Sequence, residues 1–506
     1  GGGVSAARPA LVVISVDGAT PAFARQFGLF RSAAGRPVAA LPSVYPSSTA
    51  PSHASVLTGA PPAAHGVVAN RYWEHEDAAE IRGRQGALAS LHPYDRASLR
   101  CPSVLDDFLE RGLSVGAVLF PHTFSREVRH PALESCYCLY APGRRWTLPW
   151  EPGAQQRASL VVRCFEEELS FRVASRGGGE ALLTRGAQSW PLRLGTPADV
   201  VVPVGREKAI SFCMVLDDIT SHAAVLRQTT AVLVLAAGAR EARDWVRGPV
   251  AAHSRSVEYT ANPAHDFHES PTVEWVTQAA LGLAAETPDV MFVRYNQVDH
   301  AQEFLYWQAT RGDRDTAAAA RRQIEAVYRR VAAGVDALRE AVGAACPVVV
   351  LSDHGIDRVD THVAPNRILA DLGLASDLVF QGDSNVCYLY GKRGLSGAER
   401  AQFEQLARPA RIRVLPPAEL RARGAWHEGR CGTLVLESAP HTEFQYHDGD
   451  LVERVQSASH GFSPRLPAMD GIWQVLQGPE LPTPASVTGV ADVLRTALSR
   501  TRRQSP

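Results

Sequence analysis

The sequence predicts an α/β protein with a doubly wound, mainly parallel sheet and a β-rich insertion. Three short apolar runs, at residues 11–16, 290–293 and 347–351, are each followed by polar residues. Buried parallel strands have such continuous apolar runs, and ligands in open α/β folds bind where these strands end. Residues 316–342 have apolar side chains spaced by three and four, which indicates an amphipathic crossover helix between the last two strands.

A β-rich insertion is expected to interrupt this core. Residues 134–256 contain short β-like runs such as 159–163 and 231–235, separated by glycine and proline clusters, and they lack long helical periodicity. We therefore expect a core in three parts, at residues 1–133, 257–394 and 451–506. A small irregular subdomain is expected at residues 395–450.

The composition excludes several classes of protein. Lys and Arg (52) nearly balance Asp and Glu (53) among 506 residues, so the net charge of −1 argues against polymeric nucleic acid or an anionic membrane surface as partner. No apolar run reaches the ~18 residues of a membrane span. The eight cysteines include no C-x-x-C pair, which argues against a zinc ribbon. The compartment and oligomeric state stay open, with a cytoplasmic location slightly favoured.

A threonine near the start of a short predicted helix is the candidate nucleophile. Pro51 suits a first helical position and Gly59 suits a helix end, which places Thr49 just before a two-turn helix. The N-terminus of a helix favours an alkoxide and offers N–H groups to phosphate oxygens. By itself, however, the pattern favours a threonine that only caps the helix.

Acidic and histidine residues near the other predicted strand ends change that interpretation. Asp17, Asp299 and the pair Asp353 and His354 each follow an apolar run, and His460 precedes a glycine late in the chain. Carboxylate and imidazole together suit Zn²⁺, with Mn²⁺ or Fe as less common choices. Two such metals about 4 Å apart can stabilise both the attacking and the leaving oxygen of a phosphoryl group.

Together these segments resemble the alkaline phosphatase superfamily, specifically its type I phosphodiesterase and nucleotide pyrophosphatase branch. The matching segments follow the family's order along nearly the whole chain: Val-Asp-Gly at 16–18, Thr-Ala-Pro-Ser-His at 49–53, Leu-Thr-Gly at 57–59, His-Gly-Val-Val-Ala-Asn at 65–70, Ser-Asp-His-Gly at 352–355 and Ser-His-Gly-Phe at 459–462. The resemblance implies an alkaline phosphatase-like core with two divalent metal ions, most of all Zn²⁺.

The resemblance also implies a role for each matching residue. Thr49 is similar to the family's nucleophile, which becomes transiently phosphorylated, and Asn70 to the asparagine that binds a phosphoryl oxygen. As an alternative, Asn70 is only a turn residue. The implied ligands are Asp17, Thr49, Asp353 and His354 for one metal, and Asp299 and His460 for the other.

One ligand departs from the family's Asp-x-x-x-His motif, because Glu303 follows Asp299 where a histidine is expected. Glu303 either ligates the second metal, which would make that site more tolerant of Mn²⁺ or Mg²⁺, or leaves it to His300, or leaves the site weakened or empty. We favour ligation by Glu303.

Aromatic residues flank the metal-site segments and are expected either to stack on the substrate or to belong to the core. Tyr72 and Trp73 follow Asn70, and a second group follows Glu303, namely Phe304, Tyr306 and Trp307.

The resemblance implies hydrolysis of a small phosphodiester, pyrophosphate or phosphonate through a phosphothreonine intermediate. The alternatives are a phosphomonoesterase that acts on a small metabolite, and a non-catalytic binding or scaffold protein that retains the fold. No basic residue is recognisable beside the nucleophile, which favours diesters, pyrophosphates or phosphonates over dianionic monoesters.

Overall fold

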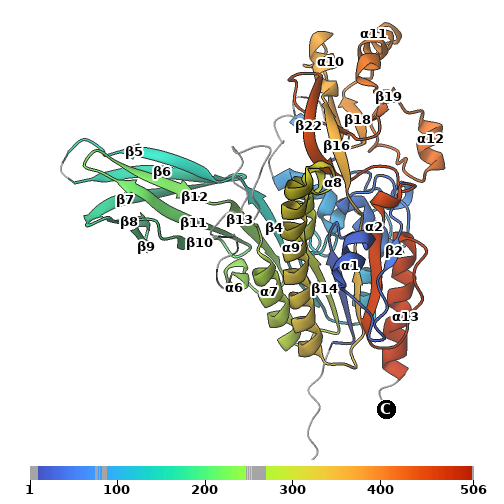
Figure 1. Cartoon of the computed structure of the whole chain (residues 1–506), viewed down its shortest axis with the longest axis horizontal. Helices are drawn as coiled ribbons and strands as arrows, with labels where there is room; N and C mark the ends of the chain where they lie inside the picture. Colours follow the sequence, from blue (N-terminus) through green and yellow to red (C-terminus); the bar gives the residue numbers. More distant parts are fainter. Residues whose placement is uncertain are drawn as a thin grey trace, which may run out of the picture. The chain divides into compact units, whose positions relative to one another are not determined.

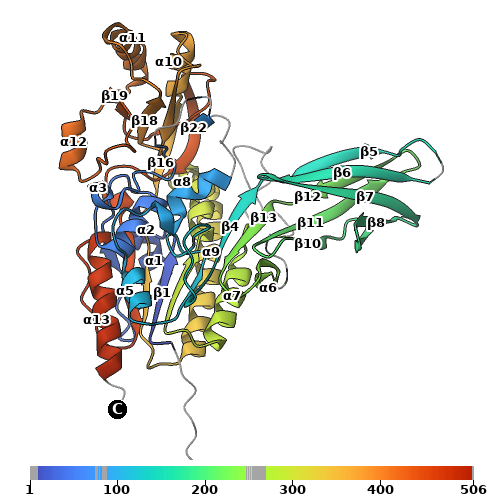
Figure 2. The same ribbon diagram turned by 180° about the vertical axis from the view of Figure 1, so that it is seen from behind.

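The computed structural model describes residues 9–74, 78, 80–81, 88–153, 155–246, 248, 250, 252 and 269–503. The chain divides into two compact units (Figures 1 and 2). Unit 1 comprises Gly1–Leu133 and Ala280–Pro506, and unit 2 comprises Glu134–Ala279. The boundary that we predicted between residues 256 and 257 lies outside the described residues.

A mainly parallel sheet forms the centre of unit 1, as the sequence predicted. β1 pairs in parallel with β14 on one side and β15 on the other, and β14 pairs in parallel with β3. β23 is antiparallel to β15, and β2 is antiparallel to β23. The order is β2 (Ala39–Leu41), β23 (Gly471–Gln477), β15 (Val348–Leu351), β1 (Leu11–Val16), β14 (Val290–Tyr295) and β3 (Val115–Val118).

Apolar side chains cover this sheet. Leu11 and Val13 of β1 belong to a buried cluster that also contains residues of α2, α5 and α13. The alternate residues Val12 and Ile14 are fully buried as well, as expected of a parallel sheet that is covered on both faces. Among the described residues, the α-helices of unit 1 are α1 (Pro21–Phe27), α2 (Thr49–Thr58), α3 (Pro62–His65), α5 (Val104–Glu110), α8 (Gln297–Arg311), α9 (Arg314–Val342), α10 (Pro365–Asp371), α11 (Gly397–Ala407), α12 (Pro417–Ala422) and α13 (Val490–Arg503), and α7 (Val273–Ala285) begins in unit 2 and ends in unit 1.

The crossover helix predicted at residues 316–342 is confirmed as α9, the long helix in Figure 1. Its N-cap Asp313 accepts hydrogen bonds from the backbone N–H groups of Asp315 and Thr316, and Gly343 follows its last residue. One stripe of the helix is buried, including Ile324, Val327, Tyr328, Val331, Val335 and Leu338. These residues follow the spacing of three and four on which the prediction was based.

Two smaller sheets of unit 1 lie after β15 in the sequence. Strand β16 pairs in parallel with β21 and antiparallel with β22. The first sheet has the order β21 (Thr442–Phe444), β16 (Asp357–Val363) and β22 (Val452–Ser459). The second has the order β17 (Leu378–Gly382), β18 (Val386–Gly391), β20 (Val435–Glu437) and β19 (Arg413–Val414).

Unit 2 is built from antiparallel strands. The strands of one group pair in the order β4 (Leu133–Ala141), β13 (Ala231–Ala237), β11 (Lys208–Ile219), β12 (Ala223–Gln228) and β5 (Arg144–Pro149), and β10 (Ala198–Val204) also pairs with β11. The second sheet has the order β6 (Arg157–Cys164), β7 (Glu167–Gly177), β8 (Glu180–Arg185) and β9 (Gln188–Arg193). Phe171 and Phe212 pack edge to face between the two groups. The short helix α6 (Ala242–Trp245) follows β13.

The cysteines and the helices add two further facts. All eight cysteines are free, and seven of them are buried. Within the described ranges, no helix is both long and apolar enough to cross a bilayer.

Candidate active site

The candidate ligands lie where adjacent parallel strands end. Asp17 follows β1 directly, Asp353 and His354 follow β15, and Asp299 lies in the first turn of α8 after β14. Because β1 pairs with both β14 and β15, these three strand ends are neighbours. Residues at such an edge can converge although more than 300 positions separate them in the sequence.

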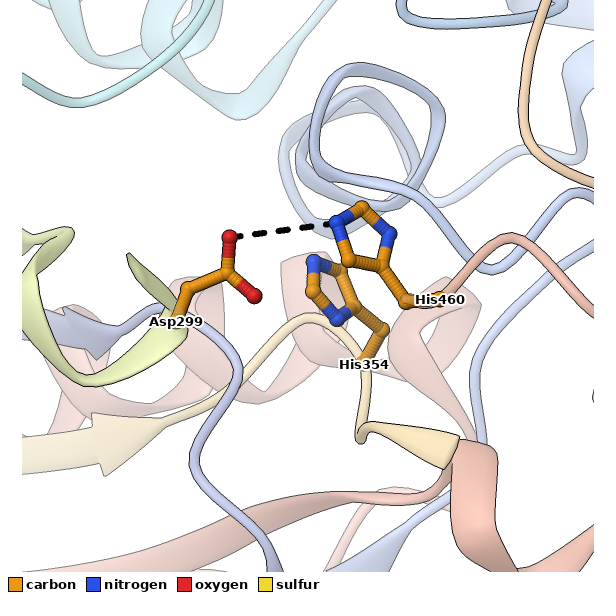
Figure 3. A group of neighbouring side chains, drawn as sticks. All are labelled: Asp299, His354 and His460. Carbon is orange, nitrogen blue, oxygen red and sulfur yellow. Dashed lines mark ion pairs between the residues drawn. The ribbon is translucent and has the colours of Figure 1, made fainter. Parts of the chain in front are cut away.

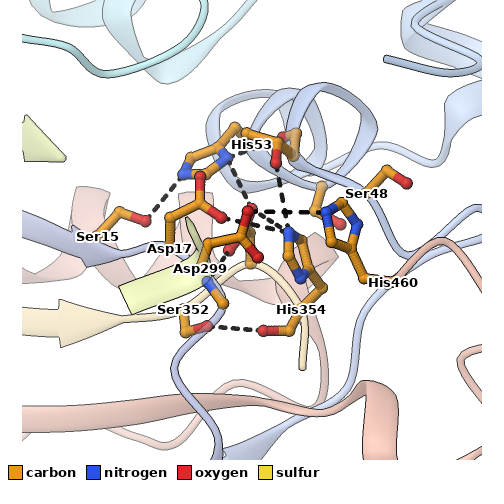
Figure 4. A network of polar contacts seen from close by, with 12 residues as sticks. Ser15, Asp17, Ser48, His53, Asp299, Ser352, His354 and His460 are labelled. Atoms are coloured by element: carbon orange, nitrogen blue, oxygen red, sulfur yellow. Dashed lines mark hydrogen bonds and ion pairs between the residues drawn. The ribbon is translucent and has the colours of Figure 1, made fainter. Parts of the chain in front are cut away.

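The first ligand group consists of Asp17, Asp353 and His354, whose ligand atoms all lie within 4.8 Å of one another. Nε2 of His354 is 3.3 Å from Oδ1 of Asp17 and 3.1 Å from Oδ2 of Asp353 (Figure 4). Nδ1 of the same ring donates a hydrogen bond to the carbonyl oxygen of Gly355 at 2.8 Å. This bond leaves Nε2 as the ring atom that faces the carboxylates.

The second ligand group consists of Asp299, His354 and His460 (Figure 3). Nε2 of His460 is 3.8 Å from Oδ2 of Asp299, and its Nδ1 donates to the carbonyl oxygen of Ser47 at 3.2 Å. The rings of His354 and His460 stack with centroids 3.6 Å apart. The two groups therefore adjoin and share His354.

Thr49 lies beside both groups at the start of α2. The helix begins at Thr49 itself, two residues before Pro51, which we expected at its first position, with Ser48 as N-cap and Gly59 in the left-handed conformation at its end. The hydroxyl oxygen of Thr49 is 3.3 Å from Nε2 of His354. The candidate nucleophile thus reaches the histidine that the two ligand groups share.

Asn70 is held against the first turn of α2. The backbone N–H of Ala50 donates to Oδ1 of Asn70 at 2.8 Å. Because this bond uses the amide oxygen, the amide nitrogen of Asn70 is the atom free to donate to a ligand. The structure therefore brings Asn70 next to the helix start at Thr49, although Asn70 comes 21 residues after Thr49 in the sequence.

The donor atoms fit divalent cations. Oδ1 of Asp17, Oδ1 of Asp299 and Oδ2 of Asp353 are buried and accept no hydrogen bond. Buried carboxylate oxygens without such partners cost free energy, which a bound cation offsets. Carboxylates together with imidazole nitrogens are the donors that Zn²⁺ prefers.

The family model for type I phosphodiesterases and nucleotide pyrophosphatases matches residues 11–160 and 214–463. The chain belongs to this family. Membership supports a metal-dependent phosphoester hydrolase that acts on a small phosphoester, and the two ligand groups agree with metal dependence. No match was found among curated protein sequences.

Several solved structures have a fold similar to that of this chain. Murine ectonucleotide pyrophosphatase/phosphodiesterase 5 is 13% identical with a TM-score of 0.55, over 97% of this chain and 95% of that chain. The human protein of the same name is 12% identical with a TM-score of 0.53, over 97% and 94%. Phosphonoacetate hydrolase from Sinorhizobium meliloti 1021, in complex with phosphonoacetate, is 18% identical with a TM-score of 0.51, over 98% and 96%. These likenesses agree with the predicted fold class.

Arg294 fixes Asp17, one of the candidate ligands of this phosphodiesterase-family member, a role that our sequence analysis missed. Its guanidinium donates to Oδ2 of Asp17 at 2.6 Å and to the carbonyl oxygen of Leu119 at 2.7 Å. Burial alone would raise the pKa of Asp17, but the imidazole of His354 and the charge of Arg294 lower it well below its usual value. An arginine inside the otherwise apolar strand β14 was the signal in the sequence.

Charge is unbalanced around the second ligand group. Burial and the charge of Glu303 raise the pKa of Asp299 well above its usual value. Burial and His354 lower the pKa of His460, but Asp299 and Glu303 outweigh them and raise it to about 9. Positive charge is therefore favoured here, as a proton or as a cation.

Glu303 lies one turn after Asp299 on α8, with Oε1 3.6 Å from Nε2 of His460. One third of its side chain (33%) is exposed, and it belongs to neither of the three-residue ligand groups. His300 is also outside both groups, and burial lowers the pKa of its ring. Glu303 thus contacts His460, a predicted ligand of the second metal.

Gly18 lets the ends of β1 and β14 approach each other. Its φ is +73°, and a Cβ atom there would lie 2.7 Å from Oδ1 of Asp299. Its backbone N–H also donates to Oδ1 of Asp353 at 3.1 Å. A residue with a side chain would therefore be strained in its backbone and would displace a ligand oxygen.

His53 and Asp383 make hydrogen bonds that support the candidate nucleophile and its neighbours. Nδ1 of His53 donates to the carbonyl oxygen of Thr49 at 2.8 Å, and its Nε2 accepts from the hydroxyl of Ser15 at 2.8 Å. Asp383 accepts hydrogen bonds from Ser48 and Asn70. The sequence offered only a weak signal for Asp383, a polar Asp-Ser-Asn turn after an apolar run.

The aromatic residues that flank the metal-site segments contact other parts of the protein. Tyr72 is only 3% exposed and lies beneath the guanidinium of Arg430, at 4.8 Å from its ring centroid. Tyr72 belongs to a buried hydrophobic cluster, and Trp73 is partly buried and packs against that cluster. Tyr306 contacts Phe23 edge to face, and the indole N–H of Trp307 donates to Asp360.

Proposed function

We propose that the chain is a two-metal hydrolase that cleaves a small phosphodiester, pyrophosphate or phosphonate through a phosphorylated Thr49. The observation that carries this proposal is the position of the Thr49 hydroxyl, 3.3 Å from the histidine shared by two groups of metal-ligand type. A capping threonine without a catalytic role would not require buried carboxylates around it.

The ligands are proposed in two sets. Asp17, Asp353 and His354 would hold one divalent cation together with Thr49. Asp299, His460 and Glu303 would hold the other, with Mn²⁺ or Mg²⁺ tolerated beside Zn²⁺ because Glu303 contributes oxygen. Bound there, such cations lower the pKa of a hydroxyl group and balance the negative charge of the phosphoryl oxygens.

The protein's own groups would then position the reaction. The Thr49 oxygen forms a bond to phosphorus while the bond from phosphorus to the leaving group breaks. The amide nitrogen of Asn70 and the positive end of α2 stabilise the non-bridging oxygens. Water then loses a proton and forms a bond to phosphorus while the bond between phosphorus and the Thr49 oxygen breaks, and that oxygen takes up a proton to become a free hydroxyl again.

The balance of charges favours a substrate with a single negative charge at the reacting phosphorus. Asp17, Asp299, Asp353 and Glu303 all lie at the site, whereas the nearby cation Arg294 is bound to Asp17. A dianionic monoester would be repelled more strongly by these carboxylates than a diester. Contacts of Tyr72 and Trp73 with the substrate stay a prediction.

A substrate panel under three metals tests the proposal. A chromogenic phosphodiester, a phosphomonoester, a nucleotide pyrophosphate and a phosphonate would each be assayed with Zn²⁺, Mn²⁺ and Mg²⁺. We expect turnover of at least one diester, pyrophosphate or phosphonate that exceeds turnover of the monoester. Preference for the monoester would identify a phosphatase, and absence of turnover with an empty second metal site would identify a binding protein.

Replacement of the nucleophile gives the sharpest comparison. Thr49→Ala is expected to reduce kcat by at least about 10³-fold with bound metal retained, because the covalent step loses its oxygen. Thr58→Ala at the other end of α2 is the matched control, since its hydroxyl donates to the carbonyl oxygen of Ala54 and accepts from the backbone N–H of Ala60. Unchanged turnover in Thr49→Ala would contradict the proposed mechanism.

A further inference from the structure

Asp383 is a buried carboxylate that joins separate segments of the candidate site. It lies in the turn between β17 and β18 and is 6% exposed. Oδ1 accepts from the hydroxyl of Ser48 and from the backbone N–H of Ser384 at 3.0 Å. Oδ2 accepts from the backbone N–H of Asn70 at 2.8 Å. Both oxygens are thus engaged by groups next to the proposed nucleophile and phosphoryl-binding amide.

The bond to Ser48 replaces an ordinary helix cap. An N-cap serine usually accepts a hydrogen bond from an N–H group of the first turn. Ser48 is the N-cap of α2 and accepts no such bond, and its hydroxyl donates to Asp383. The side chain of Asn70 accepts from Ala50 in that first turn. Asp383 therefore holds both the cap residue of α2 and the residue whose side chain binds its first turn.

The loop that carries His460 lies close to the carboxylate of Asp383. A Cβ atom at Gly461 would lie 2.8 Å from Oδ1 of Asp383 and 3.0 Å from the hydroxyl oxygen of Ser48. The backbone N–H of Gly461 donates to the carbonyl oxygen of Ser47 at 2.8 Å. The segments of Thr49, Asn70 and His460 consequently meet at Asp383.

We propose that Asp383 is a positioning residue that sets Thr49 and Asn70 at the spacing required for phosphoryl transfer. It acts through Ser48 and Asn70, since neither of its oxygens contacts a ligand group. Its backbone is itself held, because its N–H donates to Val386 and its carbonyl oxygen accepts from Tyr446. This inference rests on the proposed function for its effect on turnover, but the contacts on which it depends can be tested without turnover.

Asp383→Asn is the informative variant because it keeps the shape of the side chain. An amide has one oxygen, whereas two backbone N–H groups, those of Ser384 and Asn70, need an acceptor here. One of them must lose its partner. We expect kcat to fall about 10- to 100-fold, with a smaller change in KM and with bound metal unchanged, because small misplacements of reacting groups have effects of this size. A change of less than about twofold in kcat would overturn the proposal, as would loss of metal.

A double-mutant comparison shows whether Asp383 acts through Asn70. In the background of Asn70→Ala, the fold decrease caused by Asp383→Asn should shrink to a few-fold, because the amide to be positioned is gone. An equal fold decrease in both backgrounds would indicate an independent structural effect and would overturn the proposal. The matched control is Asp377→Asn, a surface carboxylate 3.4 Å from Arg393, which should leave kcat within about twofold.

Amide hydrogen exchange tests the contacts independently of catalysis. Peptides that cover residues 45–58 and 66–71 should exchange faster in Asp383→Asn than in the unaltered protein or in Asp377→Asn. If no ester in the panel is hydrolysed, the proposed function fails, and this measurement still decides the role of Asp383. Unchanged exchange in both peptides would overturn the inference.

Discussion

In the proposed function, Glu303 sets how hard the second metal site is. It faces His460 at 3.6 Å from a position one turn after Asp299, where the family's motif has a histidine. A carboxylate offers oxygen and a negative charge, whereas an imidazole offers a neutral nitrogen that suits Zn²⁺. The choice of metal should therefore depend on this one side chain.

Glu303→His is expected to shift the second site toward Zn²⁺. We expect the ratio of Zn²⁺ to Mn²⁺ affinity to rise about 10-fold, since a ligand change typically alters metal affinity by at least this much. Metal content after equilibration with mixed Zn²⁺ and Mn²⁺ measures the ratio. Glu325→His on the surface of α9 is the control, because Glu325 pairs with Arg329 on the same helix. The same ratio in all three proteins would show that Glu303 is not a ligand.

Residues that follow strands were easier to predict than residues that support them. Asp17, Asp353 and His354 come directly after apolar runs, so the rule for parallel sheets indicated that they would converge. Asp383 acts on Ser48 and Asn70, which lie 335 and 313 residues away in the sequence. No local pattern indicates such contacts, because they depend on how the smaller sheet approaches α2.

Helices α2 and α3 are joined by a histidine that must stay neutral. His65 ends α3 and is fully buried. Its Nδ1 accepts from the backbone N–H of Val67 at 3.0 Å, and its Nε2 donates to the hydroxyl of Ser55 in α2 at 3.0 Å. Burial and the neighbouring charge of His122 lower the pKa of His65 well below its usual value. A protonated ring would lose the bond from Val67.

This pair of helices predicts acid sensitivity. Below about pH 6.5 the unfolded chain protonates His65 while the folded chain does not, so the unfolded state binds more protons. The free energy of unfolding therefore falls as the pH is lowered. His65→Asn keeps an acceptor for Val67 and removes the titration. Between about pH 7 and pH 5, the unfolding free energy of this variant should fall less steeply than that of the unaltered protein. The difference between the two slopes should be up to about 1.4 kcal/mol per pH unit. Urea unfolding at three pH values measures both slopes, and equal slopes would contradict the prediction.

At the level of elements, periodicity predicted more than pairing. The spacing of apolar residues located α9 closely, because a long helix repeats its pattern many times. The three residues of β2 carry no recognisable pattern, yet β2 forms an edge of the central sheet of unit 1. Its place depends on pairing with β23, more than 400 residues later, and propensity alone does not supply such long-range information.

Across the whole molecule, the ligands connect distant parts of unit 1. They extend from Asp17 after β1 to His460 after β22. Cations bound at the two ligand groups, which share His354, would hold these segments together in the folded state only, since the unfolded chain has no such sites.

Removal of metal should therefore lower the melting temperature. At a free metal concentration about 100 times the dissociation constant, binding stabilises the folded state by about 2.7 kcal/mol. For a protein of this size we expect a decrease of several degrees after treatment with a chelator, and recovery when Zn²⁺ is added back. Differential scanning calorimetry measures the shift, with added Na⁺ as the control. An identical melting temperature before and after chelation would argue against metal binding by these residues.

The ion pair between Arg294 and Asp17 also bears on how the protein is made. During synthesis from the N-terminus, Asp17 leaves the ribosome first, Arg294 follows, and Asp353 and His354 emerge only later. Arg294 is therefore the first partner to neutralise this carboxylate as β14 adds to β1. Metal uptake by the complete proposed site would have to await His460, so it would be a late step in biosynthesis.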